Sequence, residues 1–369
     1  MSFGVYVHWP WCARICPYCD FNVYRARGQD AAGLIAAIAD DAKALRARIG
    51  PRPAETVFLG GGTPSLLSGA EVGALLDAVD AAFPIAAGAE ITLEANPEDA
   101  ARFADQVAAG VNRLSLGVQA LEEGALKALG RTHTAAVARA GIETAAATGA
   151  RVSADFIYAR EGQTLSAWEA ELREACALPA EHLSLYQLTI EPGTAFARAA
   201  ARGRALTPPP DIAADFYELT QAITAGAGFD GYEISNHARG KKAQSAHNRL
   251  YWAGADWAGL GPGAHGRITM AGQRWGALTP LRPANYIADP RPAWAEITPE
   301  DDATEKLLMG LRVEDGLDPA PIETLRRRRF DAGTLADLRA QGLLSAGPRL
   351  ALTPAGRLLA DRVALELLK

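Results

Sequence analysis

The sequence is poor in cysteine and contains no long hydrophobic run. Only four cysteines occur in 369 residues, at positions 12, 16, 19 and 176, whereas a disulfide scaffold would need more of them in a shorter chain. No apolar stretch reaches the roughly 20 residues of a membrane span. The first residues, MSFGVYVHWP, lack the basic start and apolar core of a signal peptide. These absences predict a cytoplasmic protein, in which thiols stay reduced.

An excess of charge of one sign is also missing. The chain has 37 Lys and Arg against 43 Asp and Glu, a net charge of −6 at pH 7, which predicts no nucleic-acid partner. About half of the residues (49%) are hydrophobic, enough to bury a substantial core. The length predicts one large domain and a smaller one.

Short β-branched runs alternate with helical segments over the first 190 residues. The alternation predicts a parallel sheet with right-handed crossovers, and six such units favour an α/β fold with a partial (β/α)6 barrel whose closure the pattern does not settle. Functional loops of barrels follow the strands, at one mouth. The predicted strands are 5–8, 56–60, 90–95, 113–118, 151–158 and 182–188, and the predicted helices are 31–49, 69–83, 99–109, 121–129, 134–148 and 166–178.

The remaining chain is less regular. Residues 226–266 are rich in Gly, Trp, Tyr and His, and the proline-rich segment 279–298 has the composition of a linker. Helical patterns near 299–313, 319–329 and 334–341, followed by a predicted strand–turn–strand at 343–356, resemble a winged-helix module. We therefore predict a barrel domain at 1–190, an extension of it at 191–290 and a C-terminal helical, winged-helix-like domain at 291–369.

Three of the cysteines lie close together in WCARICPYCDF, residues 11–21. A disulfide would leave one thiol over, and a redox dithiol of Cys16 and Cys19 would leave Cys12 without a role. A zinc ion would need a fourth ligand, for which His8 is the candidate. A [4Fe–4S] cluster would use all three thiolates and leave one iron open to an amino-acid ligand. Cys176, in a helical pattern, is expected to be a buried structural thiol.

The spacing C-x₃-C-x₂-C after a first strand, with an aromatic residue before the last cysteine, resembles the radical S-adenosylmethionine (SAM) superfamily. The resemblance implies a [4Fe–4S] cluster on Cys12, Cys16 and Cys19, with SAM at the open iron and Tyr18 beside it. LGGGTPSLL, residues 59–67, is by itself equally typical of a tight turn. Beside the cysteines it is similar to the loop that holds the methionine end of SAM, which implies contacts from Gly61, Gly62 and Thr63.

Further motifs extend the resemblance over nearly the whole chain. ITLEANPED, LSLGVQA, LGRTHT, RVSADFIYA and HLSLYQLTIEPGTAF are similar to the oxygen-independent coproporphyrinogen III oxidase-like family. Asp155 lies in an apolar strand, so a polar partner is expected for it on physical grounds alone. The residues that the resemblance implies as SAM contacts are Tyr6, Glu94, Gln119, Arg131 and Asp155, and it leaves open whether one or two SAM molecules bind.

The sequence departs from this family's pattern in one loop. The family usually has Tyr-Gly-Leu-Pro-Gly-Gln-Thr after the fifth strand, whereas residues 158–164 read YAREGQT. Loss of the glycine and the proline changes the stiffness of a loop expected near the site. The departure therefore predicts a change in the geometry of SAM binding at this loop.

Two branches of the family fit the chain differently. The oxidases carry a further cysteine where this chain has Phe21, whereas His247, Asn248, Tyr251 and Trp252 match the HNxxYW pattern of the HemW-type heme chaperones. This resemblance implies a protein that binds a cluster, SAM and heme and passes heme to an acceptor hemoprotein. His247 would be an axial ligand; a histidine with satisfied hydrogen bonds in an aromatic corner is the structural alternative.

The alternative function is that of the oxidase, a radical SAM enzyme that decarboxylates coproporphyrinogen III to protoporphyrinogen IX. A zinc protein is the third. The resemblance assigns no catalytic residue, and it leaves open whether the chain is an enzyme and whether SAM is consumed. Dimerisation and peripheral contact with membrane hemoprotein complexes are open in the same way.

Overall fold

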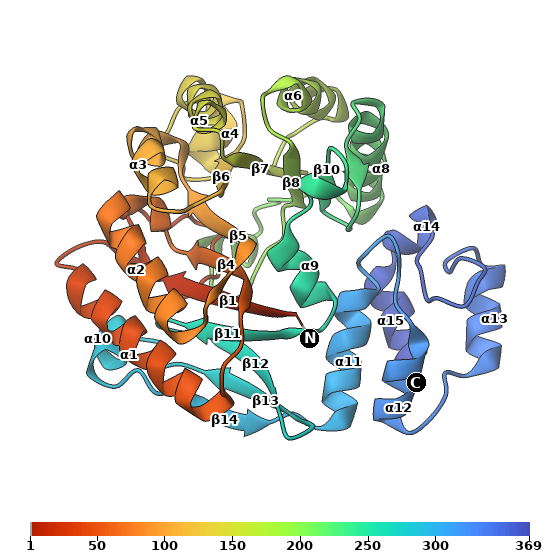
Figure 1. Cartoon of the computed structure of the whole chain (residues 1–369). Coiled ribbons are helices and arrows are strands. Elements are labelled where there is room, and N and C mark those ends of the chain that lie inside the picture. The colour runs from red at the N-terminus through yellow and green to blue at the C-terminus, as the bar shows by residue number, and fades with distance from the viewer. Residues whose placement is uncertain (1) are drawn as a thin grey trace.

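Residues 2–369 are described by a computed structural model, in which a curved sheet of twelve strands runs through the molecule (Figure 1). The strands are β1 (Phe3–Trp9), β2 (Trp11–Cys12), β3 (Tyr24–Arg25), β4 (Ala54–Gly61), β5 (Ile85–Ala95), β6 (Arg113–Gln119), β7 (Arg151–Tyr158), β8 (His182–Gln187), β9 (Asp230–Gly231), β10 (Asn236–Ala238), β11 (Asp256–Leu260), β12 (His265–Met270), β13 (Gln273–Leu278) and β14 (Ala293–Glu296). In the large sheet their order is β14-β13-β12-β11-β1-β4-β5-β6-β7-β8-β10-β9, and β2 and β3 form a separate pair. The stretch from β11 to β8 is parallel throughout.

The helices follow the strands along the chain. They are α1 (Ala31–Ile49), α2 (Gly69–Ala82), α3 (Phe103–Ala108), α4 (Glu123–Ala128), α5 (Ala135–Ala147), α6 (Leu165–Ala177), α7 (Ala195–Ala200), α8 (Pro210–Gly226), α9 (Ala246–Trp252), α10 (Pro283–Ala288), α11 (Pro299–Gly310), α12 (Pro319–Arg326), α13 (Ala332–Ala340), α14 (Pro354–Arg357) and α15 (Ala360–Leu368), with short 3₁₀ turns η1 (Pro64–Leu66), η2 (Pro97–Arg102) and η3 (Lys241–Ala243). None of the helices in the described residues is long and apolar enough to cross a bilayer.

All six strands predicted from the sequence are present, with helices α1 to α6 on the outer side of the sheet, which confirms the fold class (Figure 1). The structure adds a seventh parallel strand, β11, which pairs with β1. Its five residues include Gly259 and lack a β-branched side chain, so the pattern gave little signal for it. The linker predicted at 279–298 was wrong, because this segment forms α10 and the edge strand β14.

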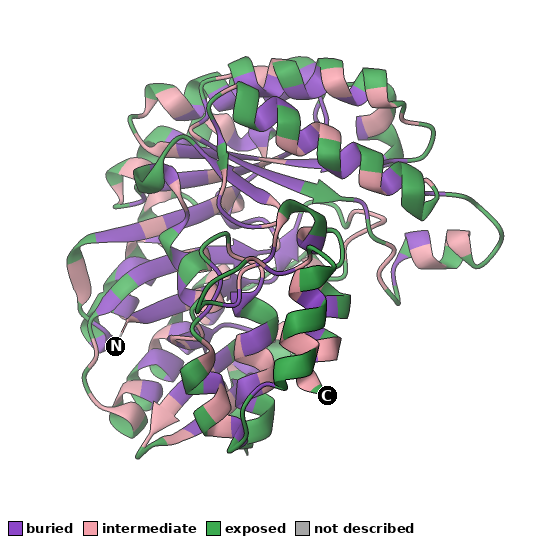
Figure 2. Ribbon diagram, turned by 90° about the vertical axis from the view of Figure 1, so that its right-hand side faces the viewer, coloured by how far each residue is buried: buried purple, intermediate pink, exposed green. Residues whose placement is uncertain are grey.

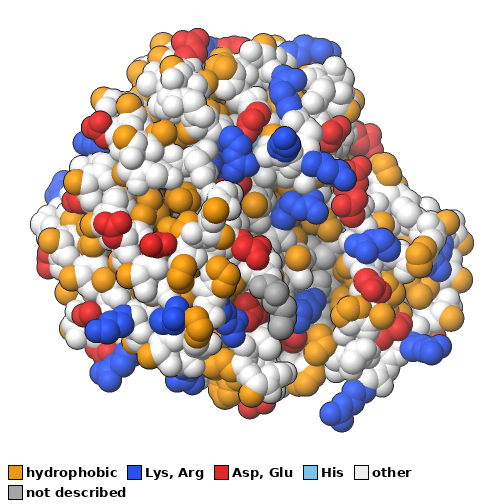
Figure 3. Space-filling view, viewed as in Figure 1, with side chains coloured by type: hydrophobic (Ala, Val, Ile, Leu, Met, Phe, Trp, Pro, Cys, Tyr) orange, Lys and Arg blue, Asp and Glu red, His pale blue; other side chains and the backbone are white. Residues whose placement is uncertain are grey.

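The strands are buried on both faces, as expected for a parallel sheet that is covered by helices. Six of the seven residues of β1 are buried, and β6 and β7 are largely buried too. The strands form the buried interior and the helices turn exposed faces outward (Figure 2). On the face shown in Figure 3, positive and negative side chains are interspersed without a broad area of one sign.

The C-terminal region has an apolar core of its own, in which Leu307, Leu317 and Val363 are buried. It packs beside the sheet through a buried ion pair in which Arg274 of β13 lies 3.1 Å from Asp302 of α11. This helical region was predicted. The expected strand–turn–strand is reduced to the isolated bridges Leu317↔Leu350 and Leu344↔Leu352. The boundaries near 190 and 290 stay predictions.

A buried carboxyl group ties the first helix to the segment after the sheet. Asp41 of α1 is 1% exposed and accepts a 2.8 Å hydrogen bond from the hydroxyl of Tyr286 in α10. The same hydroxyl accepts the N–H of Gly261 at 2.9 Å. Burial raises the pKa of Asp41 to about 7, against which the hydrogen bond from Tyr286 works.

We predict that this group makes stability depend on pH. Because the folded-state pKa lies above the usual value of about 4, its contribution is complete below about pH 4 and is lost as the pH rises through about 7. Asp41→Asn keeps an acceptor for the Tyr286 hydroxyl but cannot ionise. The unchanged protein should therefore lose stability between pH 5 and 8, and the variant should not lose this contribution. Over this range the free energy of unfolding of Asp41→Asn minus that of the unchanged protein should increase by more than about 1.4 kcal/mol, the value of one pKa unit.

Denaturant titrations at a series of pH values measure this difference. Asp40→Asn, which changes the exposed neighbour on the same helix, is the matched control. Parallel curves for Asp41→Asn and Asp40→Asn over this pH range would contradict the prediction.

Candidate functional site

A cavity of about 750 Å³ lies at the carboxyl ends of the parallel strands, within the usual range for small-molecule sites. Every site residue predicted from the sequence lines it except Tyr6 and His247. The predicted residues in its wall are Cys12, Cys16, Tyr18, Cys19, Gly61, Gly62, Thr63, Glu94, Gln119, Arg131 and Asp155. Other residues of the wall were not expected from the sequence, among them Asn96, Ser115, Tyr186, Gln187, Ser235 and Arg312.

The cysteine segment forms a loop over this mouth. The short strands β2 and β3 pair at its two ends, and the N–H of Cys19 donates to the carbonyl of Cys16 at 3.2 Å. All four cysteines are free thiols. Burial raises the pKa of Cys12, and it raises that of Cys19 to about 11. The thiols of Cys12 and Cys19 are therefore neutral at pH 7 unless a metal centre holds them as thiolates.

The arrangement of the thiols suits a cluster better than a single ion. Across residues 2–369, no group of three or more His, Cys, Asp or Glu side chains is close enough to hold one metal ion. His8, the proposed fourth zinc ligand, has Nε2 2.9 Å from the carbonyl of Asn22 and Nδ1 2.9 Å from the hydroxyl of Tyr6. Because the irons of a [4Fe–4S] cluster are separate, thiols spread along one cavity wall fit it. The residues present therefore fit this group.

The glycine loop needs glycine at two positions. Gly61 has φ +105°, and a Cβ there would lie 2.4 Å from the His8 ring; a Cβ on Gly62 would lie 2.7 Å from the carbonyl oxygen of Trp11. The N–H groups of Gly61, Gly62 and Thr63 already donate, to Glu94 and to the carbonyls of Trp9 and Trp11. The loop thus offers a ligand carbonyl oxygens, which suit an ammonium group.

Two carboxyl groups stand in the cavity wall without an ion-pair partner among the described residues. Glu94, at the end of β5, accepts the N–H of Gly61 at 2.8 Å, and Asp155 on β7 accepts the Ser115 hydroxyl at 3.0 Å. The pKa of Glu94 is raised to about 7, mainly by burial. The hydrogen bond from the Gly61 N–H works against this rise, and the charge of Asp155 adds to it. Burial also raises the pKa of Asp155. Both groups favour a cationic ligand.

Arg131 connects the cysteine loop with the strand ends. Its guanidinium donates to Asn96, to the carbonyl of Gly117 at 2.9 Å and to the thiol of Cys16 at 3.6 Å. Its Nε–H is buried and has no hydrogen-bond partner. An unpaired buried donor is costly, so an acceptor on a bound ligand would stabilise it.

The HNRLYW motif lies behind the cavity. His247, on α9, is fully buried, with Nδ1 2.8 Å from the Thr56 hydroxyl and Nε2 2.8 Å from the Tyr251 hydroxyl. Its ring stacks on Phe58 with centroids 5.1 Å apart, and burial lowers its pKa to about 3. This is the packed, satisfied histidine of the structural alternative. Ligation of heme by His247 stays a prediction, and it requires the imidazole to leave these partners.

Tyr6 is likewise beside the cavity and not in its wall. Its ring lies 6.1 Å from that of Phe58, and burial raises its pKa, with the charge of Glu94 adding to the effect. Two further histidines lie elsewhere in the fold: His237 is buried, with Nε2 3.2 Å from Oε1 of Gln221, and His265 is exposed at the start of β12. Neither lines the cavity.

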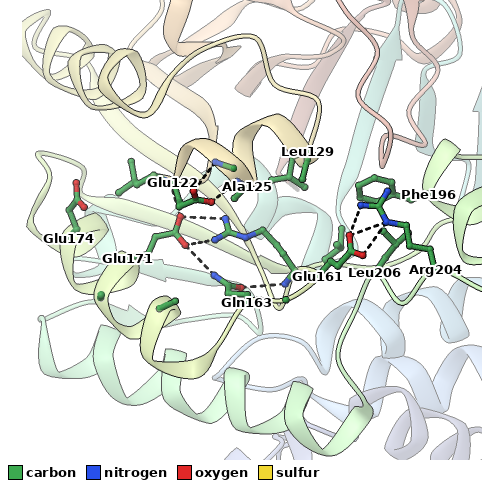
Figure 4. A pocket seen from close by; sticks show the side chains of 18 residues that line it. Glu122, Ala125, Leu129, Glu161, Gln163, Glu171, Glu174, Phe196, Arg204 and Leu206 are labelled. Atoms are coloured by element: carbon green, nitrogen blue, oxygen red, sulfur yellow. Dashed lines mark hydrogen bonds and ion pairs between the residues drawn. The ribbon is translucent and has the colours of Figure 1, made fainter.

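The departing loop, residues 158–164, borders a second cavity of about 500 Å³ between α4 and α6. In Figure 4, Glu171 and Gln163 lie toward one side of it, and Glu161 lies beside Arg204 on the other. Arg160 pairs with Glu171, and Arg204 pairs with Glu161 at 3.0 Å. None of residues 158–164 lines the main cavity. Arg160 and Glu161, which differ from the family pattern, therefore lie in the wall of the second cavity. The loop contacts the main cavity through the hydrogen bond that Arg160 donates to the carbonyl of Gln119, at 3.4 Å.

Comparison with known proteins agrees with this site. Residues 6–175 match the Radical SAM superfamily, and residues 297–359 match the HemN C-terminal domain. The chain is 38% identical to the heme chaperone HemW of Mycobacterium tuberculosis, over 99% of this chain and 95% of that one. The chain belongs to the HemW family of radical SAM proteins. Membership of this superfamily implies a [4Fe–4S] cluster and SAM.

Other relatives are similar over the whole chain or over part of it. HemW of Bacillus subtilis is 34% identical over 98% of this chain and 97% of its own length. A mitochondrial radical SAM domain-containing protein 1 of Bos taurus is 42% identical over 71% of this chain, but the chain spans only 60% of that protein. The solved coproporphyrinogen III oxidase HemN of Escherichia coli has a TM-score of 0.80 at 24% identity, covering 99% of this chain and 90% of that one. This likeness shows the shared fold.

The backbone conformation of the loop at residues 158–164 leads to a prediction about stability. Ala159 has φ +55°, a left-handed conformation that costs a residue with a Cβ about 1–2 kcal/mol and that glycine adopts freely. Relief of this strain offsets the entropy cost of glycine and the loss of the buried Cβ of Ala159, so Ala159→Gly should leave the free energy of unfolding nearly unchanged. Denaturant unfolding measures it.

Ala170→Gly, on the exposed face of α6, is the control and should lower stability by about 1 kcal/mol. If both substitutions destabilised the protein equally, the left-handed strain at Ala159 would be refuted.

Proposed function

We propose that this protein is a heme chaperone of the HemW kind, which binds a [4Fe–4S] cluster, SAM and heme and transfers heme to an acceptor hemoprotein. The full-length similarity to HemW proteins supports the class. The observation that carries the site is the single cavity in which three free thiols, a glycine loop and two buried carboxyl groups meet.

Within this proposal, each wall of the cavity has a role. Cys12, Cys16 and Cys19 hold the cluster, which when bound supplies an iron with an open coordination position and an electron. Glu94 and the glycine-loop carbonyls hold the ammonium of SAM, for which Glu94 must be ionised. The other members of the SAM set, which are Tyr6, Tyr18, Gln119, Arg131 and Asp155, surround or back the same space.

The competing function is the decarboxylation of coproporphyrinogen III. The oxidase branch carries a further cysteine where Phe21 stands here, and this side chain is 59% exposed at the cavity mouth. Anaerobic reconstitution followed by parallel heme-binding and coproporphyrinogen assays separates the two. Heme retention without porphyrin product supports the chaperone, and steady product without heme retention reverses the assignment.

Removing one cluster thiol should abolish the cluster. We expect Cys16→Ala to lose most of the iron and acid-labile sulfide per chain and the absorption near ~400 nm that thiolate-bound iron–sulfur clusters give. Cys176→Ala, which changes the buried thiol of α6, is the matched control and should keep all three signals. Zinc in place of iron, or equal metal content in both variants, would contradict the assignment.

The assignment of His247 as a heme ligand has a spectroscopic test. His247→Ala should weaken heme binding at least about tenfold, equivalent to 1.4 kcal/mol, and should shift the Soret band. Thr56→Val removes the hydroxyl that contacts Nδ1 but keeps the imidazole, and it should leave the Soret band in place. A lower melting temperature of His247→Ala with an unchanged Soret band would mean that His247 only packs.

A further inference from the structure

The side of the main cavity at β8 and β10 is built from residues without an assigned role. Tyr186 and Gln187 end β8, Ser235 precedes β10 and Arg312 follows α11. Arg312 comes from the C-terminal region, whereas the other three belong to the sheet and its connections. Two parts of the chain far apart in sequence therefore close one wall.

Arg312 carries unused hydrogen-bond donors at this wall. Its Nη2 lies 2.6 Å from Oε1 of Glu233, which is 0% exposed, so one edge of the guanidinium is held in an ion pair with this carboxylate. The pair balances charge and leaves the other nitrogens of the guanidinium available to a ligand.

Glu233 is itself held in place by other donors. Its Oε2 accepts the N–H of Ser235 at 2.8 Å and the side-chain amide of Asn236 at 2.7 Å. The segment around it pairs with the chain after Arg312, through the bridge Glu233↔Val313 and the 3.0 Å bond from the N–H of Glu314 to the carbonyl of Tyr232. Arg312 is therefore positioned at a seam of backbone pairing and not on a free surface.

The polarity of the cavity changes along its length. Glu94 lies beside the glycine loop, whereas Asp155 on β7 lies between that loop and β8. Both disfavour an anionic group in their part of the cavity. Ile157 and Leu188 give the wall apolar surface, and on the β8–β10 side Arg312 is the basic residue and Glu191 the acidic one. An arginine with free N–H groups matches a carboxylate in shape and charge. The gradient suits a ligand with an apolar body and a carboxylate directed at Arg312.

We propose that Arg312 binds a carboxylate of the transferred ligand, which, resting on the proposed function above, is a propionate of heme. Gln187 and Ser235 lie on the same side and offer further polar groups to it. The C-terminal region thereby supplies a residue that selects the ligand. Arg312 is a binding residue in this proposal and has no part in the chemistry at the cluster.

The test combines a change in the protein with a change in the ligand. Heme and heme dimethyl ester, whose propionates cannot ionise, are titrated into reconstituted full-length protein. We expect the ester to bind the unchanged protein at least tenfold more weakly than heme. Arg312→Ala should weaken heme binding by a similar factor and leave ester binding unchanged. SAM affinity, measured in parallel, should stay constant.

Two controls separate recognition from folding. Arg312→Gln combined with Glu233→Gln removes both charges, so no buried carboxylate is left unpaired, and it should behave like Arg312→Ala. Arg249→Ala changes an arginine at the same junction, 4.0 Å from Asp315, which does not line the cavity, and it should bind both ligands normally.

Each contrary result has its own meaning. Equal losses of heme and ester binding in the Arg312 variants would show a structural role and overturn the inference while heme binding itself stands. A loss of SAM affinity with heme affinity unchanged would assign the carboxylate to SAM and also overturn it. Failure of the unchanged protein to bind heme would overturn the proposed function, and the propionate assignment with it.

Discussion

The burial of two carboxyl groups at one edge of the sheet is the constraint around which the site is arranged. Glu94 and Asp155 have hydrogen bonds from Gly61 and Ser115, but no arginine or lysine of the described residues forms an ion pair with them. Burying an uncompensated carboxylate is costly, so burial raises the pKa of both groups and a bound cation would stabilise their ionised forms. SAM carries an ammonium and a sulfonium, and its binding would repay a cost that the folded chain otherwise bears.

Much of this edge was predictable because local patterns encode it. Parallel strands place their carboxyl ends together, so Cys12, Gly61, Glu94, Gln119 and Asp155, each at or after a strand, were expected to meet, and they do. Asn96 could have been added by the same rule, since it directly follows the end of β5. Arg312 could not, because only the pairing of residues 312–314 with the segment around Glu233 brings it to the cavity.

The elements that the sequence did not reveal are short or proline-rich. β11 has five residues and β14 has four, and both derive their stability from neighbours in the sheet and not from their own propensity. The proline-rich composition around Pro283 predicts a linker. In the structure Pro283 is the first residue of α10, where its missing N–H costs nothing. Tertiary pairing decided these segments, and a single sequence contains little of that information.

The division of the cavity wall between chain segments has a consequence for how the site works. The radical SAM match ends at residue 175 and contains the three thiols of the cavity wall and both carboxyl groups, so the residues predicted to bind the cluster and SAM all lie in that part. Leu188, Ser235 and Arg312 complete the wall on the β8–β10 side and come from later segments that pack against it. Because the later segments reach the cavity only through tertiary packing, a shift of the C-terminal region would alter this side and leave the cysteine loop intact. On the proposed function, this division would let ligand binding change without a change in the cysteine loop.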